Sequence, residues 1–162
     1  MTPELVILAF EGPDKGGKGR LINEVNRQSK FEYLCIDRFT ASAWVYDRLS
    51  GRRKREERLI ALESELAGLK HAVVVNIIVL SEPNILRERI RREDEYPEQR
   101  LADLDRALEF YEAYRLNITR IPTIVADTSK QSPEITAAEI LKQVSIYVDR
   151  HRHTHQRPEK QN

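Results

Sequence analysis

The sequence predicts an α/β fold in which a short parallel sheet of about four strands is flanked by helices, giving three layers. Two continuous apolar runs, "LVILAF" at residues 5–10 and "AVVVNIIVL" at 72–80, show no polar alternation, as expected of strands buried on both faces. Segments with helical spacing of apolar residues lie between and after these runs. Strands that alternate with helices form parallel sheets, and ligands gather beyond the carboxyl ends of such strands.

The first half of the chain supplies two strands and three helices. After the strand at 5–10, apolar residues repeat at helical spacing from Lys18 to about Ser29. The segment "FEYLCIDRF" predicts a second short strand that ends near Asp37, and "ASAWVYDRLSG" predicts a short helix closed by Gly51. A basic stretch follows, and the leucines of "LIALESELAGLK" then mark an amphipathic helix.

The second half contains the strand at 72–80 and one further strand. "NILRERIRRE" is typical of a helix, with Ser81 and Asn84 as candidate caps, and a longer helix is expected from about Gln99 to Leu116. "PTIVADTS" supplies the fourth strand. "SPEITAAEILKQVSIYV" then begins a helix with a serine cap and a proline at its first position.

Length and composition favour a single domain. A chain of 162 residues can bury one sizeable core, here expected at residues 1–150, followed by a flexible tail at 151–162. A formal net charge of +1 gives no sign of a polyanionic partner. The lone cysteine, Cys35, excludes a disulfide framework and indicates a reducing, cytoplasmic location with Cys35 in the core. No apolar run is long enough to span a membrane, so no membrane partner is expected.

Residues 12–18, Gly-Pro-Asp-Lys-Gly-Gly-Lys, match the phosphate-binding pattern G-x-x-x-x-G-K. The match lies between a predicted buried strand and a predicted helix, which is the context that the pattern requires. Small residues let backbone N–H groups converge on phosphate oxygens, and Lys18 can reach the terminal phosphates. The expected fold is therefore that of P-loop nucleoside triphosphatases. The residues expected to bind ATP in this loop are Gly12, Pro13, Asp14, Lys15, Gly16, Gly17, Lys18, Gly19 and Arg20.

Gly19 stands where most such loops carry a Ser or Thr hydroxyl that helps to hold Mg²⁺. The missing hydroxyl is consistent with a metal-poor or inactive site. Mg²⁺ commonly keeps several waters, however, so phosphate oxygens, waters and a carboxylate can hold it. "GGKG" resembles the loop of adenylate kinases, which have glycine at this position. Arg20 departs from that family, which usually has Ser or Thr there, and its guanidinium could contact an α-phosphate or face solvent.

Three segments, "FEGPDKGGKG", "IDRF" and the late "DTSKQSPE", together resemble the thymidylate kinase-like branch of the P-loop nucleotide kinases. The resemblance extends over residues 5–20, 36–46 and about 77–141. Only some 18 residues separate Lys18 from Asp37, where thymidylate kinases usually place a strand and helices. The chain therefore resembles a minimised, phage-type nucleotide or nucleoside kinase. The resemblance implies ATP and Mg²⁺ as cofactors.

Asp37 and Arg38 lie at the predicted carboxyl end of the second strand. The carboxylate could hold metal-bound water while the guanidinium clamps an acceptor phosphate bidentately, and the resemblance implies the same roles. It also implies that Asp14 contacts the acceptor sugar and that Lys15 stands where some relatives direct an arginine at the transferred phosphate. Without the resemblance, Asp37 and Arg38 could form a structural ion pair, and Asp14 and Lys15 could be solvated loop charges.

"RERIRRED" places four arginines just before the polar stretch "EDEYPEQ", a candidate mobile loop. Phosphoryl transfer needs cations and a closing lid, so a lid is expected at about 87–100. On a helix, Arg87 and Arg91 share one face, while Arg89 and Arg92 share another. Arg91 and Arg92 are favoured as catalytic residues because they are closest to the loop. A solvated, salt-bridged helix explains the segment equally well.

Residues on either side of the site could contact the two nucleotides. Phe39 and Tyr46 are candidate acceptor-binding residues because similar kinases build the acceptor site after their D-R motif, whereas core packing better explains Trp44. Ser129 and Lys130 are expected beside the donor nucleotide, since such kinases cradle the donor adenine after the last strand. The alternating histidines of the tail are weak evidence for a metal site and are discounted.

The expected function is ATP-dependent transfer of the γ-phosphoryl group to a (deoxy)nucleoside monophosphate. The expected catalytic residues are Lys18, Asp37, Arg38, Lys15, Arg91 and Arg92, with Asp37 toward the metal. One alternative is a nucleoside kinase, or a kinase acting on modified nucleotides in phage DNA, although DNA is not the favoured partner. Another is a non-catalytic nucleotide-binding regulatory module. A homodimer is a further possibility, and the expected location is the host cytoplasm if the chain is phage-encoded.

Overall fold

The computed structural model describes residues 5–155 and contains a four-stranded parallel sheet in the order β2-β1-β3-β4. The strands are β1 (Leu5–Glu11), β2 (Leu34–Asp37), β3 (Ala72–Leu80) and β4 (Thr123–Asp127). The helices are α1 (Lys18–Ser29), α2 (Thr40–Leu49), α3 (Glu56–Ala67), α4 (Pro83–Glu93), α5 (Pro97–Ala113), the π-helix η1 (Tyr114–Ile118) and α6 (Pro133–His155). The α/β fold predicted from the sequence is confirmed.

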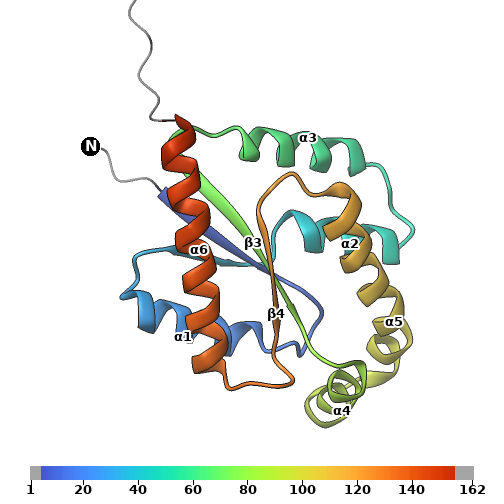
Figure 1. The fold of residues 1–162 in the computed structure, drawn as a ribbon. Helices are drawn as coiled ribbons and strands as arrows, with labels where there is room; N and C mark the ends of the chain where they lie inside the picture. The colour runs from blue at the N-terminus through green and yellow to red at the C-terminus, as the bar shows by residue number, and fades with distance from the viewer. Residues whose placement is uncertain (1–4, 156–162) are drawn as a thin grey trace, which may run out of the picture.

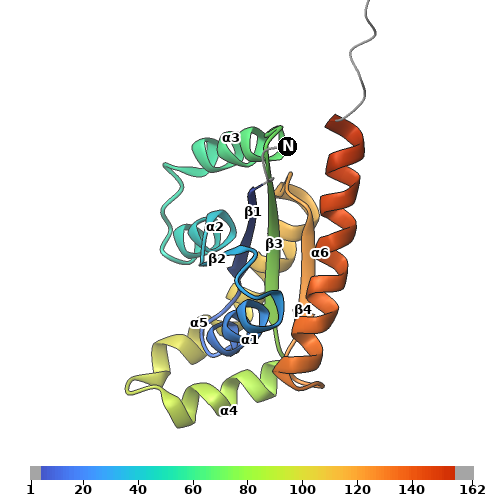
Figure 2. The ribbon, with the colours of Figure 1, turned by 90° about the vertical axis from the view of Figure 1, so that its left-hand side faces the viewer.

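Helices cover both faces of the sheet, with α1 and α6 on one face and α2, α3 and α5 on the other (Figures 1 and 2). Alternate residues of the central strand β3 face these two layers. Val75 and Ile77 pack in the core with α1 and α6, whereas Ile78 packs with α2 and α5. A strand between two helical layers needs apolar residues at nearly every position, which explains the unbroken runs in the sequence.

A buried carboxylate joins α3 to the strand and helix ends around it. Glu63 accepts hydrogen bonds from the hydroxyl of Thr119 at 2.8 Å and the backbone N–H of Arg120 at 3.1 Å. It also accepts bonds from the hydroxyls of Thr40 and Tyr114. A buried carboxylate needs such donors to offset its lost hydration, so this cluster fixes α3 against η1 and the start of α2.

The polar stretch between α4 and α5 is a tight corner. Helix α4 ends at Glu93, and α5 begins at Pro97, two residues before the predicted start at Gln99. Pro97 occupies the first helical turn, where its missing N–H costs nothing. Figure 2 shows that α4 and the start of α5 project together from the rest of the molecule. The candidate loop is therefore short, and its two helices form the projecting element.

Helix α6 is longer than the sequence pattern predicted. It continues to His155, so residues 151–155 of the expected flexible tail are helical, and the remaining expected tail, 156–162, lies outside the described residues. His151 bonds the carbonyl of Leu69 at 2.8 Å, which ties the end of α6 to the segment after α3. None of the helices between residues 5 and 155 combines the length and apolar character needed to cross a membrane.

Cys35 of β2 packs against the core between the sheet and helices α1 and α6. Its thiol is free and half-buried, and burial raises the pKa of that thiol to about 11. A core position was expected from the sequence, and the side chain lies at the edge of that core.

Candidate functional site

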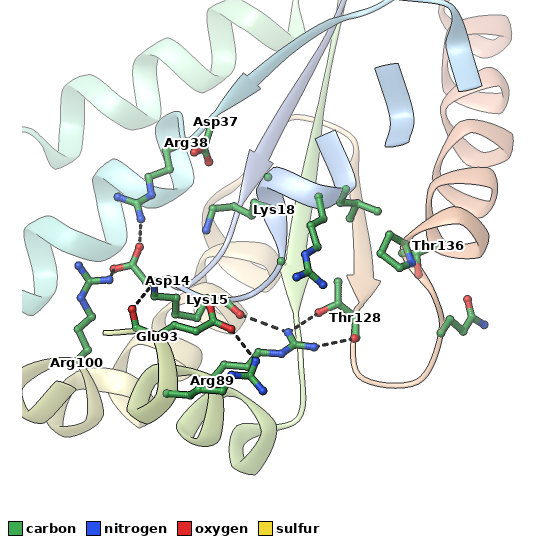
Figure 3. Close-up of a pocket in the computed structure, with 17 residues that line it drawn as sticks. Asp14, Lys15, Lys18, Asp37, Arg38, Arg89, Glu93, Arg100, Thr128 and Thr136 are labelled. Carbon is green, nitrogen blue, oxygen red and sulfur yellow. Dashed lines mark hydrogen bonds and ion pairs between the residues drawn. The ribbon is translucent and has the colours of Figure 1, made fainter. Parts of the chain in front are cut away.

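A cavity of about 540 Å³ lies beyond the carboxyl ends of the strands, between the loop after β1, the start of α1 and the α4–α5 corner (Figure 3). Its basic lining residues are Lys15, Lys18, Arg20, Arg38, Arg89, Arg92 and Arg100. Its acidic lining residues are Asp14, Asp37 and Glu93. The basic side chains outnumber the acidic ones, so the cavity attracts anions although the whole chain is close to neutral.

The loop between β1 and α1 has the backbone shape of an anion cradle. Gly12 has φ +128°, and a Cβ built there would lie 2.2 Å from the carbonyl oxygen of Val79, so only glycine fits. Gly17 has φ +92° and is the N-cap of α1, and no side chain caps that helix end. The first N–H groups of the helix therefore face the cavity without a side-chain acceptor, which favours a bound phosphate.

Lys18 is folded back onto this loop. Its side chain is only 7% exposed, and Nζ donates to the carbonyls of Gly12 at 3.0 Å and Pro13 at 2.8 Å. Burial lowers the pKa of Lys18, and the nearby charge of Arg38 lowers it further. A charged amine held only by carbonyls gains more from a phosphate than it loses in leaving them. Lys18 is thus positioned to transfer its hydrogen bonds to an anion in the cavity.

Gly19 and Arg20 follow at the start of α1. Nothing lies within 4 Å of a Cβ built at Gly19, so a larger side chain has room there. The missing hydroxyl is therefore not a consequence of packing. Arg20 is exposed and lines the cavity, and its charge helps to lower the pKa of Glu93 on the opposite wall. This long-range attraction is weaker than the hydrogen bond from Arg92 that dominates the pKa shift of Glu93.

Asp37 and Arg38 both line the cavity but do not pair with each other among the described residues. Within residues 5–155, the carboxylate of Asp37 has no hydrogen bond or ion pair, and it ends β2 facing the cavity (Figure 3). Arg38 has φ +66°, a conformation that most residues avoid, and its N–H bonds the carbonyl of Phe10 at 2.9 Å. Its guanidinium binds Asp14 and lies 5.4 Å from the ring centre of Tyr46. The alternative of a structural Asp37–Arg38 ion pair is wrong.

Asp14 connects the loop to α5 as well. Arg100 forms ion pairs with Asp14, Nη1 to Oδ2 at 2.9 Å, and with Asp94, Nε to Oδ2 at 2.9 Å. Arg38 and Arg100 thus hold the two different oxygens of the Asp14 carboxylate (Figure 3). Arg100 could not be predicted as a site residue, because the sequence of α5 carries no local signal that this residue approaches the phosphate loop.

The arginines of α4 divide between two faces. Arg89 donates to the carbonyl oxygens of Lys15 and Thr128, each at 3.3 Å, and Arg92 lines the cavity and pairs with Glu93 at 2.7 Å. Arg91, which the sequence favoured, is exposed and does not line the cavity. Residues three apart share a helix face, so the face that carries Arg92 carries Arg89 and not Arg91. Arg89, and not Arg91, therefore lies on the cavity side of α4, and a lid role for Arg91 stays a prediction.

The segment after β4 also contributes to the lining of the cavity. Ser129 turns back to Asp127, and its N–H donates to Asp127 Oδ1 at 2.8 Å, while Lys130 lies 3.9 Å from the same carboxylate. Neither Ser129 nor Lys130 lines this cavity, and their placement beside the donor nucleotide stays a prediction. Thr128 does line it, and its hydroxyl donates to the carbonyl of Gly16 at 2.7 Å. The other lining residues from this segment are Gln131, Pro133 and Thr136.

The aromatic residues after the D-R pair lie beside the cavity and not on its surface. Phe39 is the residue that precedes α2, and Tyr46 lies under the guanidinium of Arg38. Neither is among the lining residues, so their proposed contacts with an acceptor base need the cavity to open further. Trp44 is buried and contacts the rings of Phe110 and Tyr114, so core packing accounts for it.

No protein-family model and no curated protein sequence matches this chain. Among solved structures, the YorR protein of Bacillus subtilis in complex with phosphorylated GDP is 23% identical, with a TM-score of 0.66 over 88% of this chain and 98% of that chain. A sugar kinase from Janibacter sp. HTCC2649 is 15% identical, with a TM-score of 0.52 over 91% of this chain and 95% of that chain. A gluconokinase from Sinorhizobium meliloti 1021 is also 15% identical, with a TM-score of 0.50 over 94% of this chain and 98% of that chain. These likenesses show a shared P-loop kinase fold.

Proposed function

We propose that the protein is a P-loop phosphotransferase that moves the γ-phosphoryl group of ATP to a (deoxy)nucleoside monophosphate. The observation that carries the proposal is the meeting of two anion-binding arrangements in one cavity. The phosphate loop with Lys18 forms one, and the arginines Arg38 and Arg100 around Asp14 form the other. The fold shared with a nucleotide complex, a sugar kinase and a gluconokinase supports phosphoryl transfer in general.

The loop residues would hold the donor. Backbone N–H groups from Gly16 to Gly19 and the start of α1 would surround the β-phosphate, and Lys18 would move from the Gly12 and Pro13 carbonyls to the terminal phosphates. Thr128 supports this arrangement because its hydroxyl holds the Gly16 carbonyl. Arg20 would face the α-phosphate from the first turn of α1.

The arginine pair would hold the acceptor. Arg38 and Arg100 both bind the Asp14 carboxylate, and Arg100 also pairs with Asp94. A phosphate monoester carries more charge and more acceptor oxygens than the Asp14 carboxylate. An acceptor phosphate could therefore displace the Asp14 carboxylate and bind both Arg38 and Arg100. A nucleoside has no anionic group to do so, which favours a monophosphate as acceptor. Asp14 would then be released toward the sugar.

The residues also fit a Mg²⁺ ion. The carboxylate of Asp37 faces the cavity without a partner among residues 5–155, and the open space at Gly19 leaves room for a metal-bound water. Mg²⁺ would neutralise phosphate charge and fix the geometry of the donor phosphates. Asp37 would contribute by orienting a water of the metal ion.

Catalysis would consist of positioning and charge neutralisation. We also propose that the α4–α5 element, residues 87–100, is the lid of a domain at 1–150. Arg89 and Arg92 would bring their charges to the transferred group, and Lys15, whose amine lies 3.4 Å from the Glu93 carbonyl, would join loop and lid. Closure would exclude water and so limit wasteful hydrolysis of ATP.

The test is ATP consumption by the purified chain with Mg²⁺ and a panel of nucleosides, nucleoside monophosphates and DNA. We expect turnover with a monophosphate, and its loss in Lys18→Ala with the fold intact by circular dichroism. Arg91→Ala is the matched control, since it removes an arginine from the face of α4 that points away from the cavity. Tight ATP binding without turnover on any acceptor would overturn the proposal and favour a nucleotide-binding regulatory module. Turnover with nucleosides alone or with DNA alone would contradict a monophosphate acceptor and would favour a nucleoside kinase or a kinase acting on DNA.

A further inference from the structure

We infer that Tyr111 is a positioning residue that allows Lys18 to leave the phosphate loop for a bound nucleotide. Tyr111 lies on α5, and its ring is fully buried beneath the cavity between β1 and α2. The inference rests on the proposed function to the extent that the loop binds ATP. It goes beyond that proposal because it concerns a residue that need not touch either substrate.

Two donors share one carbonyl of the phosphate loop. The oxygen of Gly12 accepts a hydrogen bond from Lys18 Nζ at 3.0 Å and another from the hydroxyl of Tyr111 at 2.9 Å. Gly12 is buried, so its carbonyl depends on these partners in place of water. When Lys18 moves to a phosphate, the hydroxyl of Tyr111 remains and keeps this carbonyl satisfied.

The second carbonyl that holds Lys18 has a substitute donor of its own. The oxygen of Pro13 accepts from Lys18 at 2.8 Å and from the backbone N–H of Gly16 at 3.3 Å. Both carbonyls released by Lys18 thus retain one donor each. Only the donor at Gly12 comes from a side chain, and Tyr111 supplies it from a distant part of the sequence.

The position of Tyr111 is itself fixed by the start of α2. Its hydroxyl oxygen lies 2.9 Å from Ser42 Oγ, and Ser42 donates to the buried Glu11 at 2.5 Å. Glu11 also accepts the backbone N–H groups of Ala41 at 3.1 Å and Ser42 at 3.0 Å. Because Glu11 precedes Gly12, this cluster joins β1, α2 and α5 directly beneath the phosphate loop.

The chain offers a matched control one helical turn away. Tyr114 is 1% exposed and Tyr111 is 0% exposed, and each hydroxyl contacts a hydroxyl of α2 and lies near a buried glutamate. Tyr114 contacts Thr40 at 3.0 Å and bonds Glu63, and it has no hydrogen bond to the phosphate loop. Each of the two Tyr→Phe variants therefore removes a buried, hydrogen-bonded hydroxyl, and only Tyr111→Phe removes a donor to Gly12.

Removing the Tyr111 hydroxyl should cost little before the nucleotide binds, because Lys18 still satisfies the Gly12 carbonyl. It should cost more afterwards, because the buried carbonyl then has no donor. Tyr111→Phe is therefore expected to weaken ATP binding roughly 10-fold relative to wild type. Tyr114→Phe should lower thermal stability at least as much as Tyr111→Phe, because the Tyr114 hydroxyl bonds the buried Glu63 carboxylate, but should leave ATP affinity within about twofold.

The experiment is isothermal titration of the full chain with ATP and Mg²⁺, for wild type, both Tyr→Phe variants, Lys18→Met and the double variant Lys18→Met/Tyr111→Phe. In the Lys18→Met background no amine leaves Gly12, so Tyr111→Phe should add no further loss of affinity. Equal ATP affinities for Tyr111→Phe and Tyr114→Phe would overturn the inference, as would a full 10-fold loss from Tyr111→Phe in the Lys18→Met background. Binding and turnover are separate readouts. A Tyr111-specific loss of ATP binding in a chain that transfers no phosphoryl group would support the inference while the proposed function failed.

Discussion

Arg38 and Arg100 come from opposite walls of the cavity and bind the two different oxygens of one carboxylate, that of Asp14. Arg38 follows β2, whereas Arg100 lies in the first part of α5, next to the α4–α5 corner. The loop carboxylate thus links a residue of the rigid sheet edge to a residue of the projecting element. Any anion that replaces Asp14 would have to engage both arginines.

Loss of Arg38 or of Arg100 should mainly raise the KM for the acceptor. Arg38→Ala and Arg100→Ala should each raise the KM for a nucleoside monophosphate roughly 10- to 100-fold, since a hydrogen bond to a charged group is lost in each. The KM for ATP should change far less. Arg87→Ala is the control. Arg87 does not line the cavity and lies on the other face of α4, where it pairs with Asp105 of α5 at 2.5 Å. Equal increases in both KM values would contradict an acceptor role, and unchanged acceptor KM values would do the same.

The two faces of α4 should differ in their effect on rate. Arg89→Ala should lower kcat at least about tenfold, because it removes a cation from the cavity and the bonds to Lys15 and Thr128. Arg91→Ala should leave kcat within about twofold. Steady-state kinetics with saturating substrates measures the difference, and thermal melts show whether Arg89→Ala acts through stability alone. Similar rates for the two variants would mean that α4 does not act as a catalytic lid.

Gly12 and Gly19 should respond to alanine in opposite ways. Gly12→Ala forces a Cβ against the Val79 carbonyl at φ +128° and should reduce the free energy of unfolding by about 2–4 kcal/mol. Gly19→Ala places a methyl group in open space within α1 and should be neutral or stabilising by up to about 1 kcal/mol. Urea unfolding followed by circular dichroism tests both. A Gly12→Ala protein as stable as wild type would show that the loop can rearrange.

Turnover should require Mg²⁺ although Gly19 offers no hydroxyl. Gly19→Thr should then change the rate only modestly, because a new hydroxyl replaces at most one of several waters on the ion. The measurement is ATP binding and acceptor phosphorylation, each titrated with Mg²⁺, in wild type and Gly19→Thr. ATP binding that does not depend on Mg²⁺, without acceptor phosphorylation in wild type, would rule out kinase activity. A large gain of activity in the variant would show that Gly19 had disabled the site.

The lowered pKa of Lys18 predicts two linked pH effects. The folded protein binds fewer protons at Lys18 than the unfolded chain does between that lowered pKa and 10.5, so stability should rise with pH across this window. Over the same window, kcat/KM for ATP should fall, because the neutral amine attracts phosphates less strongly. Lys18→Met should remove this contribution to the stability slope. Stability curves for wild type and Lys18→Met that run parallel up to pH 10.5 would contradict the shift.

The fold could be predicted from the sequence because the signals for strands, helices and the phosphate loop are local. The run at 72–80 is apolar on both faces, and glycines at fixed spacing follow a buried strand, so both strand and loop could be placed without a structure. The helical periodicity also placed Arg89 and Arg92 on one face of α4. An arginine of α4 lines the cavity because it lies on this face, and its distance in sequence from the α4–α5 corner matters less.

The missed residues depend on how distant elements pack. Nothing near Arg100 or Thr128 in the sequence indicates that either will meet the phosphate loop, since these contacts follow from the angle between α5 and the sheet and from the end of β4. Glu11 is different. A charged residue that directly continues an apolar strand was visible in the sequence and signals a buried carboxylate with fixed donors, here the start of α2.

The half-buried thiol of Cys35 makes this chain convenient for spectroscopy. With its pKa raised to about 11, this thiol is far less ionised at neutral pH than an ordinary cysteine thiol, and maleimide reagents react with the ionised form. Wild-type protein can therefore serve as its own unlabelled background. Tyr96, 73% exposed at the α4–α5 corner, could carry a fluorophore after Tyr96→Cys, and changes in its emission would report opening and closing of that corner in real time.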